Sequence, residues 1–259
     1  MFYSDALSKD TIKINEISRI KLLENVNCWS RSEAVSIACR ALYYEGQNRG
    51  LSGQVSARGK SDCYITQALG VGFDEVSVSN LLEVSSDLEV IEGDGIPNPA
   101  NRFHSWIYRH RSDVGAIIHV HSPAVSAISM VGEKIEIAHM DTCGLYDEIS
   151  YLDYWPGIPI GNEEGKIFCE TLGNKKAMIM AHHGYLVAAT DIPEALYLAL
   201  HLEYAASLHL EARKIGEIRT IDDKLAREAK EWVTIRPRID AFFRYQSSRV
   251  LKRDAGCFD

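Results

Sequence analysis

A short segment with two histidines constrains this chain more than any other feature. The run Ile117-Ile118-His119-Val120-His121-Ser122-Pro123 places its histidines two positions apart, with apolar residues before and between them. Successive side chains of a β-strand point to opposite faces, so His119 and His121 are predicted to share one face while their neighbours enter a core. Pro123 cannot donate to a strand ladder, so both histidines are predicted to lie at a strand end.

A second histidine segment, His182-His183-Gly184, directly follows the apolar run Ala177–Ala181. The run is typical of a buried strand, and Gly184 allows the backbone to turn sharply after it. Two strand ends can therefore converge on one metal ion. A lone histidine on an apolar strand is more often a hydrogen-bonded core residue, and that interpretation remains the alternative for each of them.

The expected cofactor is one divalent metal ion held by imidazole nitrogens. Neutral imidazole binds zinc, iron, copper and nickel alike, so the ligand type alone does not identify the metal. Three protein ligands leave a coordination position open for water or substrate, which is the catalytic arrangement. We expect zinc ahead of iron(II), with manganese and cobalt as further candidates; the sequence contains no Cys-x-x-Cys pair to compete.

Composition excludes several classes of partner. The chain has 259 residues, 46% of them hydrophobic, and a net charge of −8. An acidic chain without a basic stripe is a poor partner for nucleic acid or an anionic membrane, so a small-molecule substrate is expected. The six cysteines are widely spaced, which indicates reduced thiols in the cytoplasm. We find neither a signal peptide nor a membrane span.

The order of predicted elements is that of an α/β protein. The capping-box pattern from Ser30 to Glu33 predicts a helix over 34–44. Further helices are predicted over about 101–110, 124–130, 195–214 and 222–233. Strands are predicted over 50–58 and 63–66, as a hairpin, and over 79–85, 89–92, 117–121, 135–139 and 177–180.

We divide the chain into three parts. Residues 1–29 form an N-terminal lead segment, residues 30–215 the main domain, and residues 216–259 a C-terminal helix and tail. The tail, Trp232–Tyr245, is rich in arginine and aromatic residues. So aromatic a segment is expected to pack on another element or on another subunit.

Several of these motifs together resemble the class II aldolase/adducin family, over about residues 30–215. They are Arg102-Phe103-His104, His119-x-His121, Ala138-His139 and the run from His182 to Ala188. The resemblance implies a three-layer αβα fold with a mostly antiparallel central sheet. It also implies a homotetramer with active sites between neighbouring subunits, and His119, His121 and His183 as the metal ligands.

The chain departs from the sugar-phosphate aldolases of that family at several positions. The acid/base glutamate corresponds to Ala100, and a tyrosine that acts as an acid in some members corresponds to Met140. The two serines that hold phosphate correspond to Asn98 and Pro99, and the asparagine of the Gly-Asn-Val-Ser loop corresponds to Gln54. Phosphate recognition needs convergent donors, so a phosphorylated sugar is not the expected substrate.

Other polar residues are candidates for the chemistry. Proton transfer is assigned to His139, Asp141 and His104, with a structural hydrogen bond as the alternative for each. Substrate binding is assigned to Gln54, Ser56, Asn98 and Arg102. Arg102 can bind a carboxylate with two parallel hydrogen bonds, and a surface ion pair is its alternative role.

Three functional classes remain open. The first is a metal-dependent lyase that cleaves a C–C bond, by aldol-type cleavage or decarboxylation, in a small non-phosphorylated oxo- or hydroxy-acid, aromatic acids included. The second is a non-haem iron(II) oxygenase that performs oxidative decarboxylation on the same scaffold. The third is an adducin-like module without catalytic activity, against which three intact histidines argue.

Overall fold

One eight-stranded sheet organises the fold, in the order β4-β3-β2-β1-β5-β8-β7-β6. The computed structural model describes residues 8–20 and 29–259. All neighbouring strands are antiparallel except β6 and β7. The strands are β1 Gln54–Arg58, β2 Cys63–Gln67, β3 Leu81–Ser85, β4 Val90–Glu92, β5 Ala116–Val120, β6 Ile149–Leu152, β7 Ala177–Met180 and β8 Gly184–Ala189.

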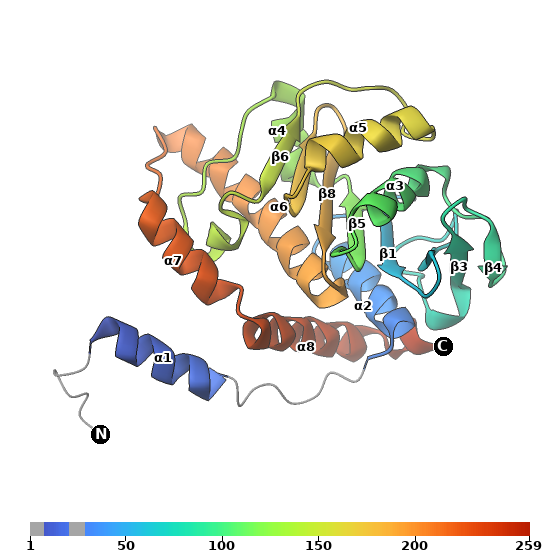
Figure 1. Cartoon of the computed structure of the whole chain (residues 1–259), viewed down its shortest axis with the longest axis horizontal. Coiled ribbons are helices and arrows are strands. Elements are labelled where there is room, and N and C mark those ends of the chain that lie inside the picture. The colour runs from blue at the N-terminus through green and yellow to red at the C-terminus, as the bar shows by residue number, and fades with distance from the viewer. Residues whose placement is uncertain (1–7, 21–28) are drawn as a thin grey trace.

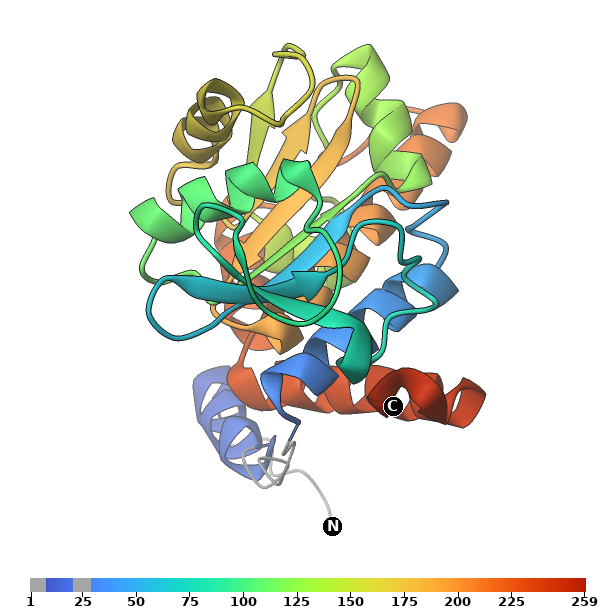
Figure 2. The same cartoon turned by 90° about the vertical axis from the view of Figure 1, so that its right-hand side faces the viewer.

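Helices cover both faces of this sheet, so the molecule has three layers. Figure 2 shows α3 and α5 on one face, with α2, α4 and α6 on the other. The predicted αβα fold with a mostly antiparallel sheet is confirmed. The helices are α1 Lys9–Ile20, α2 Arg31–Tyr44, α3 Arg102–His110, α4 Pro123–Val131, α5 Asn162–Leu172, α6 Ile192–Ile215, α7 Asp223–Val233 and α8 Arg236–Arg253, with short 3-10 helices η2 Val78–Asn80, η3 Pro99–Asn101, η4 Met140–Leu145 and η5 Ala255–Phe258.

The central strand β5 is buried along its whole length. Its side chains alternate between the two cores. Ile118 and Val120 pack with α2 and α6, whereas Ile117 packs with α3 and α5. Because the direction alternates, His119 points toward the α3 and α5 layer, as the predicted strand pattern requires.

Helix starts follow the local sequence. The Ser30 hydroxyl accepts from the Glu33 amide at 3.2 Å, and the Glu33 carboxylate accepts from the Ser30 amide at 2.7 Å, so the predicted capping box is present. At α6, Asp191 caps the amide of Glu194 at 3.0 Å. Both caps satisfy amides that a helix leaves without an internal partner.

The strand predicted over 135–139 is wrong. These residues form a loop, and its amides bond to side chains where a strand would bond to a neighbouring backbone. Ile135 donates to the Tyr151 hydroxyl at 3.0 Å, and Glu136 donates to His209 Nδ1 at 3.2 Å. The alternating polarity of 135–139 therefore belongs to a loop that is buried only at Ile135 and partly buried over 136–138, and not to a ladder. Helices α1, α5 and α8 and strands β6 and β8 were not predicted from the sequence.

The C-terminal tail packs on its own subunit. Helix α8 crosses the lower ends of α2 and α6 and buries Ile239, Phe243 and Val250 in the same core as those helices (Figure 1). Buried Arg40 of α2 forms an ion pair with Asp254, just past α8. The C-terminal residues thus contribute to the main core.

Helix α1 contributes no buried residue and lies beside α7 at the edge of the molecule (Figure 1). It is held there by the ion pairs Lys9–Glu228 at 2.5 Å and Lys13–Glu231 at 3.3 Å. Among residues 8–20 and 29–259, none of the helices has the length and apolar composition that a bilayer span requires. Five cysteines in the described ranges are free thiols; Cys28 lies outside them.

Candidate metal centre

The three predicted histidine ligands converge at one end of β5. His119 lies in β5, His121 follows the strand, and His183 lies in the turn between β7 and β8. One ring nitrogen from each histidine falls within 4.8 Å of the others, a spacing that one ion can bridge. His119 Nε2 and His121 Nε2 are 3.1 Å apart. The prediction that two strand ends bring these side chains together is confirmed.

The turn before β8 requires an unusual backbone. His182 has a φ of 58°, in the left-handed region that non-glycine residues rarely occupy. At Gly184, a Cβ atom would come within 2.4 Å of the Val120 carbonyl oxygen and 3.0 Å of His121 Cδ2. Glycine is therefore needed at this position because two strand ends meet there without space for a side chain.

A backbone carbonyl fixes the orientation of His119. Its Nδ1 donates to the Tyr185 carbonyl oxygen at 2.7 Å, so the proton of the neutral ring lies on Nδ1. The lone pair on Nε2 then points toward His121 and His183. This arrangement, one ring nitrogen bonded to the protein and the other available, is typical of histidine ligands to metals.

The three rings are neutral. Burial lowers the pKa of His119 well below its ordinary value of 6.5 and that of His183 to about 4, and burial also lowers the pKa of His121. Repulsion between the rings would add to the cost of protonation for His119 and His183. Only the unprotonated nitrogen binds a metal, so the residues suit a divalent ion. His183 Nδ1 is buried and has no hydrogen-bond partner within the described residues, which leaves it available as well.

Several substrate and proton-transfer candidates lie on the same face of the sheet as His119. Gln54 pairs directly with His119 across β1 and β5, and its Oε1 is buried without a hydrogen-bond partner in the described part of the chain. Ser56, two residues on, bonds to His104 Nδ1 at 2.7 Å and to the Tyr108 hydroxyl at 2.8 Å. Helix α3 therefore brings His104 next to the strand that faces the metal centre. Burial lowers the pKa of His104 to about 3, so this ring is also neutral.

Asn98 and Arg102 flank the start of α3. The Asn98 side chain caps η3 by accepting from the Ala100 amide at 3.0 Å. Arg102 is half-buried and forms no hydrogen bond or ion pair with any residue in the ranges described. The next residue, Phe103, packs edge-on against the His119 ring, with the ring centres 5.2 Å apart. The Arg102 guanidinium, which has no partner among the described residues, is available to a bound anion.

His139 and Asp141 occupy a different part of the fold. Both are exposed residues at the start of η4, which packs on α6 and α7. His139 Nδ1 lies 3.9 Å from the Asp141 carboxylate, and its ring faces Tyr204 of α6. The structure brings His139 and Asp141 together. It also brings His104 and Ser56 together near the histidine triad formed by His119, His121 and His183.

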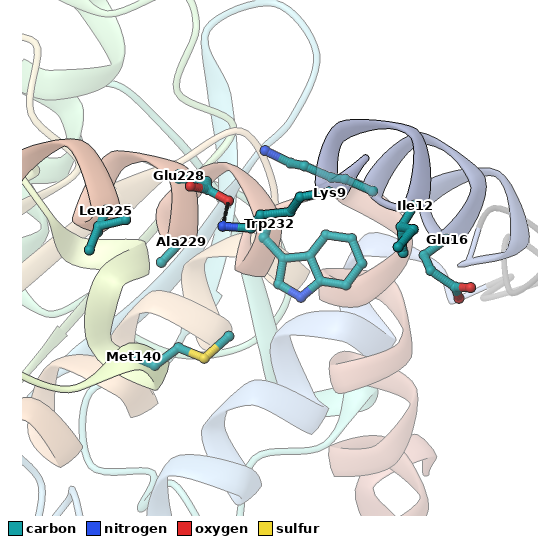
Figure 3. A pocket seen from close by; sticks show the side chains of 9 residues that line it. Lys9, Ile12, Glu16, Met140, Leu225, Glu228, Ala229 and Trp232 are labelled. Carbon is teal, nitrogen blue, oxygen red and sulfur yellow. Dashed lines mark ion pairs between the residues drawn. The ribbon is translucent and has the colours of Figure 1, made fainter. Parts of the chain in front are cut away.

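One cavity among the described residues is separate from the three histidines. It has a volume of about 410 Å³ and lies between α1, η4 and α7. Figure 3 shows the Trp232 indole and Met140 along it, with Lys9 and Glu228 paired at its edge. The walls are mostly apolar, and they include none of the predicted site residues.

Comparison with known sequences identifies the family. The family model of the Class II Aldolase and Adducin N-terminal domain matches residues 33–210. The chain belongs to the class II aldolase and adducin family. The sequence resemblance inferred from the histidine motifs is thereby confirmed.

Family relatives differ in their described activities. The chain is 27% identical to an Escherichia coli L-fuculose phosphate aldolase over 181 residues, covering 69% of this chain and 82% of the relative. It is 25% identical to Decarboxylase NovR of Streptomyces niveus over 169 residues, covering 64% and 63% of the two chains. An L-fuculose 1-phosphate aldolase structure from Glaciozyma antarctica superposes with a TM-score of 0.82 at 22% identity, covering 93% of this chain and 99% of the other. The similarity to the Glaciozyma antarctica structure shows that the two proteins share a fold.

Two residues of this class II aldolase family member escaped the sequence analysis. Tyr185 supplies the carbonyl that orients His119, and Glu203 of α6 bonds to the turn that follows His121. A backbone carbonyl leaves no signal in the sequence. Glu203 does, because it is the one acidic residue within the mostly apolar stretch Ala195–Ala206 of α6.

Proposed function

We propose that this protein is a metal-dependent lyase that cleaves a C–C bond in a small, non-phosphorylated oxo- or hydroxy-acid, aromatic acids included. The convergence of three neutral imidazoles, with His119 buried and His121 and His183 partly buried, carries the proposal. A divalent ion held by His119, His121 and His183 would supply a Lewis acid for the substrate carbonyl oxygen and the electron pair left by bond cleavage.

Residues at the start of α3 support a carboxylic acid, and not a sugar phosphate, as the substrate. Ala100 replaces the acid/base glutamate that the family resemblance implies, and it has no group that transfers a proton. Asn98 uses its side-chain oxygen to cap η3, and Pro99 has neither a hydroxyl nor an N–H to donate to phosphate. Arg102 is the available cation, and its planar guanidinium can hold a substrate carboxylate with two hydrogen bonds. A guanidinium holds phosphate as readily, so the preference for an acid rests on positions 98, 99 and 100.

The polar groups on the triad's face define the rest of the proposed site. Gln54 and Ser56 would bind substrate oxygens, and His104 is the proton-transfer candidate on this face. His139, the cap residue of η4, and Asp141 in η4 stay as further candidates that a neighbouring subunit would have to present. That role depends on the proposed homotetramer, which light scattering tests directly: a mass of 29.0 kDa in solution would mean a monomer.

Metal content and substrate turnover test the proposed function. Protein purified without chelator or added metal is analysed for bound elements, and its turnover of oxo-acids is compared with that of fuculose and ribulose phosphates. We expect about one zinc per chain and faster turnover of the non-phosphorylated acids. Faster turnover of a sugar phosphate would contradict the substrate class, and a metal-free, inactive protein would contradict the lyase.

The same measurement separates an iron(II) oxygenase from the lyase. A three-histidine set also binds iron(II), and the similarity to a protein named a decarboxylase is compatible with either chemistry. Iron in the purified protein, with dioxygen consumed as substrate is lost, would favour the oxygenase. Zinc and oxygen-independent turnover would favour the lyase.

A further inference from the structure

Glu203 holds the backbone that follows His121. Its carboxylate accepts hydrogen bonds from the Ser122 hydroxyl at 2.6 Å, the Ala124 amide at 2.8 Å and the Val125 amide at 3.0 Å. Helix α4 begins at Pro123, so these amides are the first N–H groups that the helix leaves without an internal acceptor. A residue of α6 therefore caps α4 from outside.

Ser122 occupies the cap position of α4 but makes no side-chain cap of its own. A serine at this position usually accepts from the second or third amide of the helix. Here its hydroxyl donates to Glu203, and the carboxylate takes both amides. The carboxylate also lies at the positive end of the α4 dipole, where a negative charge is favoured. Glu203 thus ties α6 to the residue adjoining His121.

His121 lacks the internal support that His119 has. His119 is oriented by the Tyr185 carbonyl, whereas within the described residues His121 has a hydrogen bond to His119 Nε2 and to no other group. A metal ion would need that same pair of nitrogens and would break the bond between them. The position of the His121 ring then depends on its backbone. Gly184 packs against this backbone on one side, and on the other side the chain continues into Ser122, which Glu203 holds.

We propose that Glu203 is a positioning residue for the metal centre: through Ser122 and the α4 amides it holds His121 where it can share an ion with His119 and His183. The inference rests on the proposed metal-dependent function. A residue that merely capped α4 would affect folding without affecting the metal, and this difference gives the test.

The experiment compares Glu203→Gln with wild type and with a control, Glu211→Gln. Glutamine keeps the size of the side chain but loses the charge and replaces one acceptor oxygen by an NH₂ group, which cannot accept from an amide. Glu211 lies on the same helix, and its exposed carboxylate pairs with Lys214 at 2.6 Å. For each protein, zinc affinity is measured by competition with a chelator, the cobalt(II) form by its visible absorption, and metal-free stability by urea unfolding.

We expect Glu203→Gln to bind zinc about 10-fold more weakly than wild type, the low end of the loss that follows removal of a group bonded directly to a metal ligand, because Glu203 acts on His121 through Ser122 and the α4 amides. Its cobalt spectrum should change, while Glu211→Gln should match wild type in both. Wild-type affinity and an unchanged spectrum in folded Glu203→Gln would overturn the proposal, even if metal-free stability fell.

Two further outcomes have definite meanings. If Glu203→Gln does not fold, Ser122→Ala replaces it, because this change removes one of the three bonds and leaves the α4 amides capped. A zinc affinity equal to wild type in Ser122→Ala would then overturn the proposal. If wild type itself binds neither zinc nor cobalt, the metal-dependent function fails first, and the role of Glu203 fails with it.

Discussion

Gly184 packs so closely on His121 that a Cβ atom at Gly184 would lie 3.0 Å from His121 Cδ2. We predict that Gly184→Ala destabilises the metal-free protein by about 1–3 kcal/mol, the usual cost of overpacking, and weakens metal binding by displacing the ring. Urea unfolding and zinc competition measure the two effects.

Gly216→Ala is the matched control for that substitution. Gly216 follows α6 and has open space where a Cβ would be placed. Its stability should stay within about 1 kcal/mol of wild type, since a surface substitution without a clash has a small effect. Equal effects of the two substitutions would contradict the close contact at His121.

His121→Ala should remove the metal and leave the fold intact. His121 lies beyond the last residue of β5 and is only partly buried, so the core loses little when its ring is removed. Elemental analysis and far-ultraviolet circular dichroism test the two parts, with His139→Ala as a control that should keep its metal. Full metal occupancy in His121→Ala would rule this residue out as a ligand.

The burial of His104 predicts a pH dependence of stability. Its pKa is about 3 in the folded protein and near 6.5 when unfolded, so the unfolded chain binds more protons below pH 6.5. The contribution of neutral His104 to the free energy of unfolding is therefore fully present above pH 6.5. It is lost as the pH falls toward 3, by up to about 1.4 kcal/mol per pH unit.

A variant without this imidazole isolates its contribution. His104→Gln, unfolded with urea at pH 6 and pH 5 in the metal-free form, should lose less stability over that interval than wild type, by on the order of 1 kcal/mol. The triad is present in both proteins and contributes equally to each. Identical pH slopes would mean that His104 is not buried in its neutral form.

Arg102 provides a test of the substrate class. If it binds the carboxylate of the substrate, Arg102→Gln should raise KM at least tenfold, because a charge-assisted bond is lost, with a smaller change in kcat. Arg109→Gln is the control, since Arg109 lies on the same helix but pairs with Asp87 at 2.8 Å. An unchanged KM in Arg102→Gln would remove this residue from the substrate site.

Features that depend only on neighbouring residues were predictable from the amino-acid sequence. Alternation in Ile117–His121 is a local property, and it was enough to place His119 on one face and to predict a strand end at His121. The capping box of Ser30 and Glu33 likewise lies within one turn of helix, so the start of α2 was predictable. The spacing of the histidine motifs also carried the family resemblance and, with it, the fold.

The distant groups that support those features could be identified only in the folded chain. Glu203 lies 81 residues from Ser122, and Tyr185 lies 66 residues from His119, so no local pattern connects them. The polarity of residues around Ile135 alternates as in a strand. However, the amides of this loop donate to the side chains of Tyr151 and His209 and not to a neighbouring strand. Periodicity records which side chains are buried, but the partner of each polar group depends on how the whole chain packs, and that packing also determines whether three histidines meet.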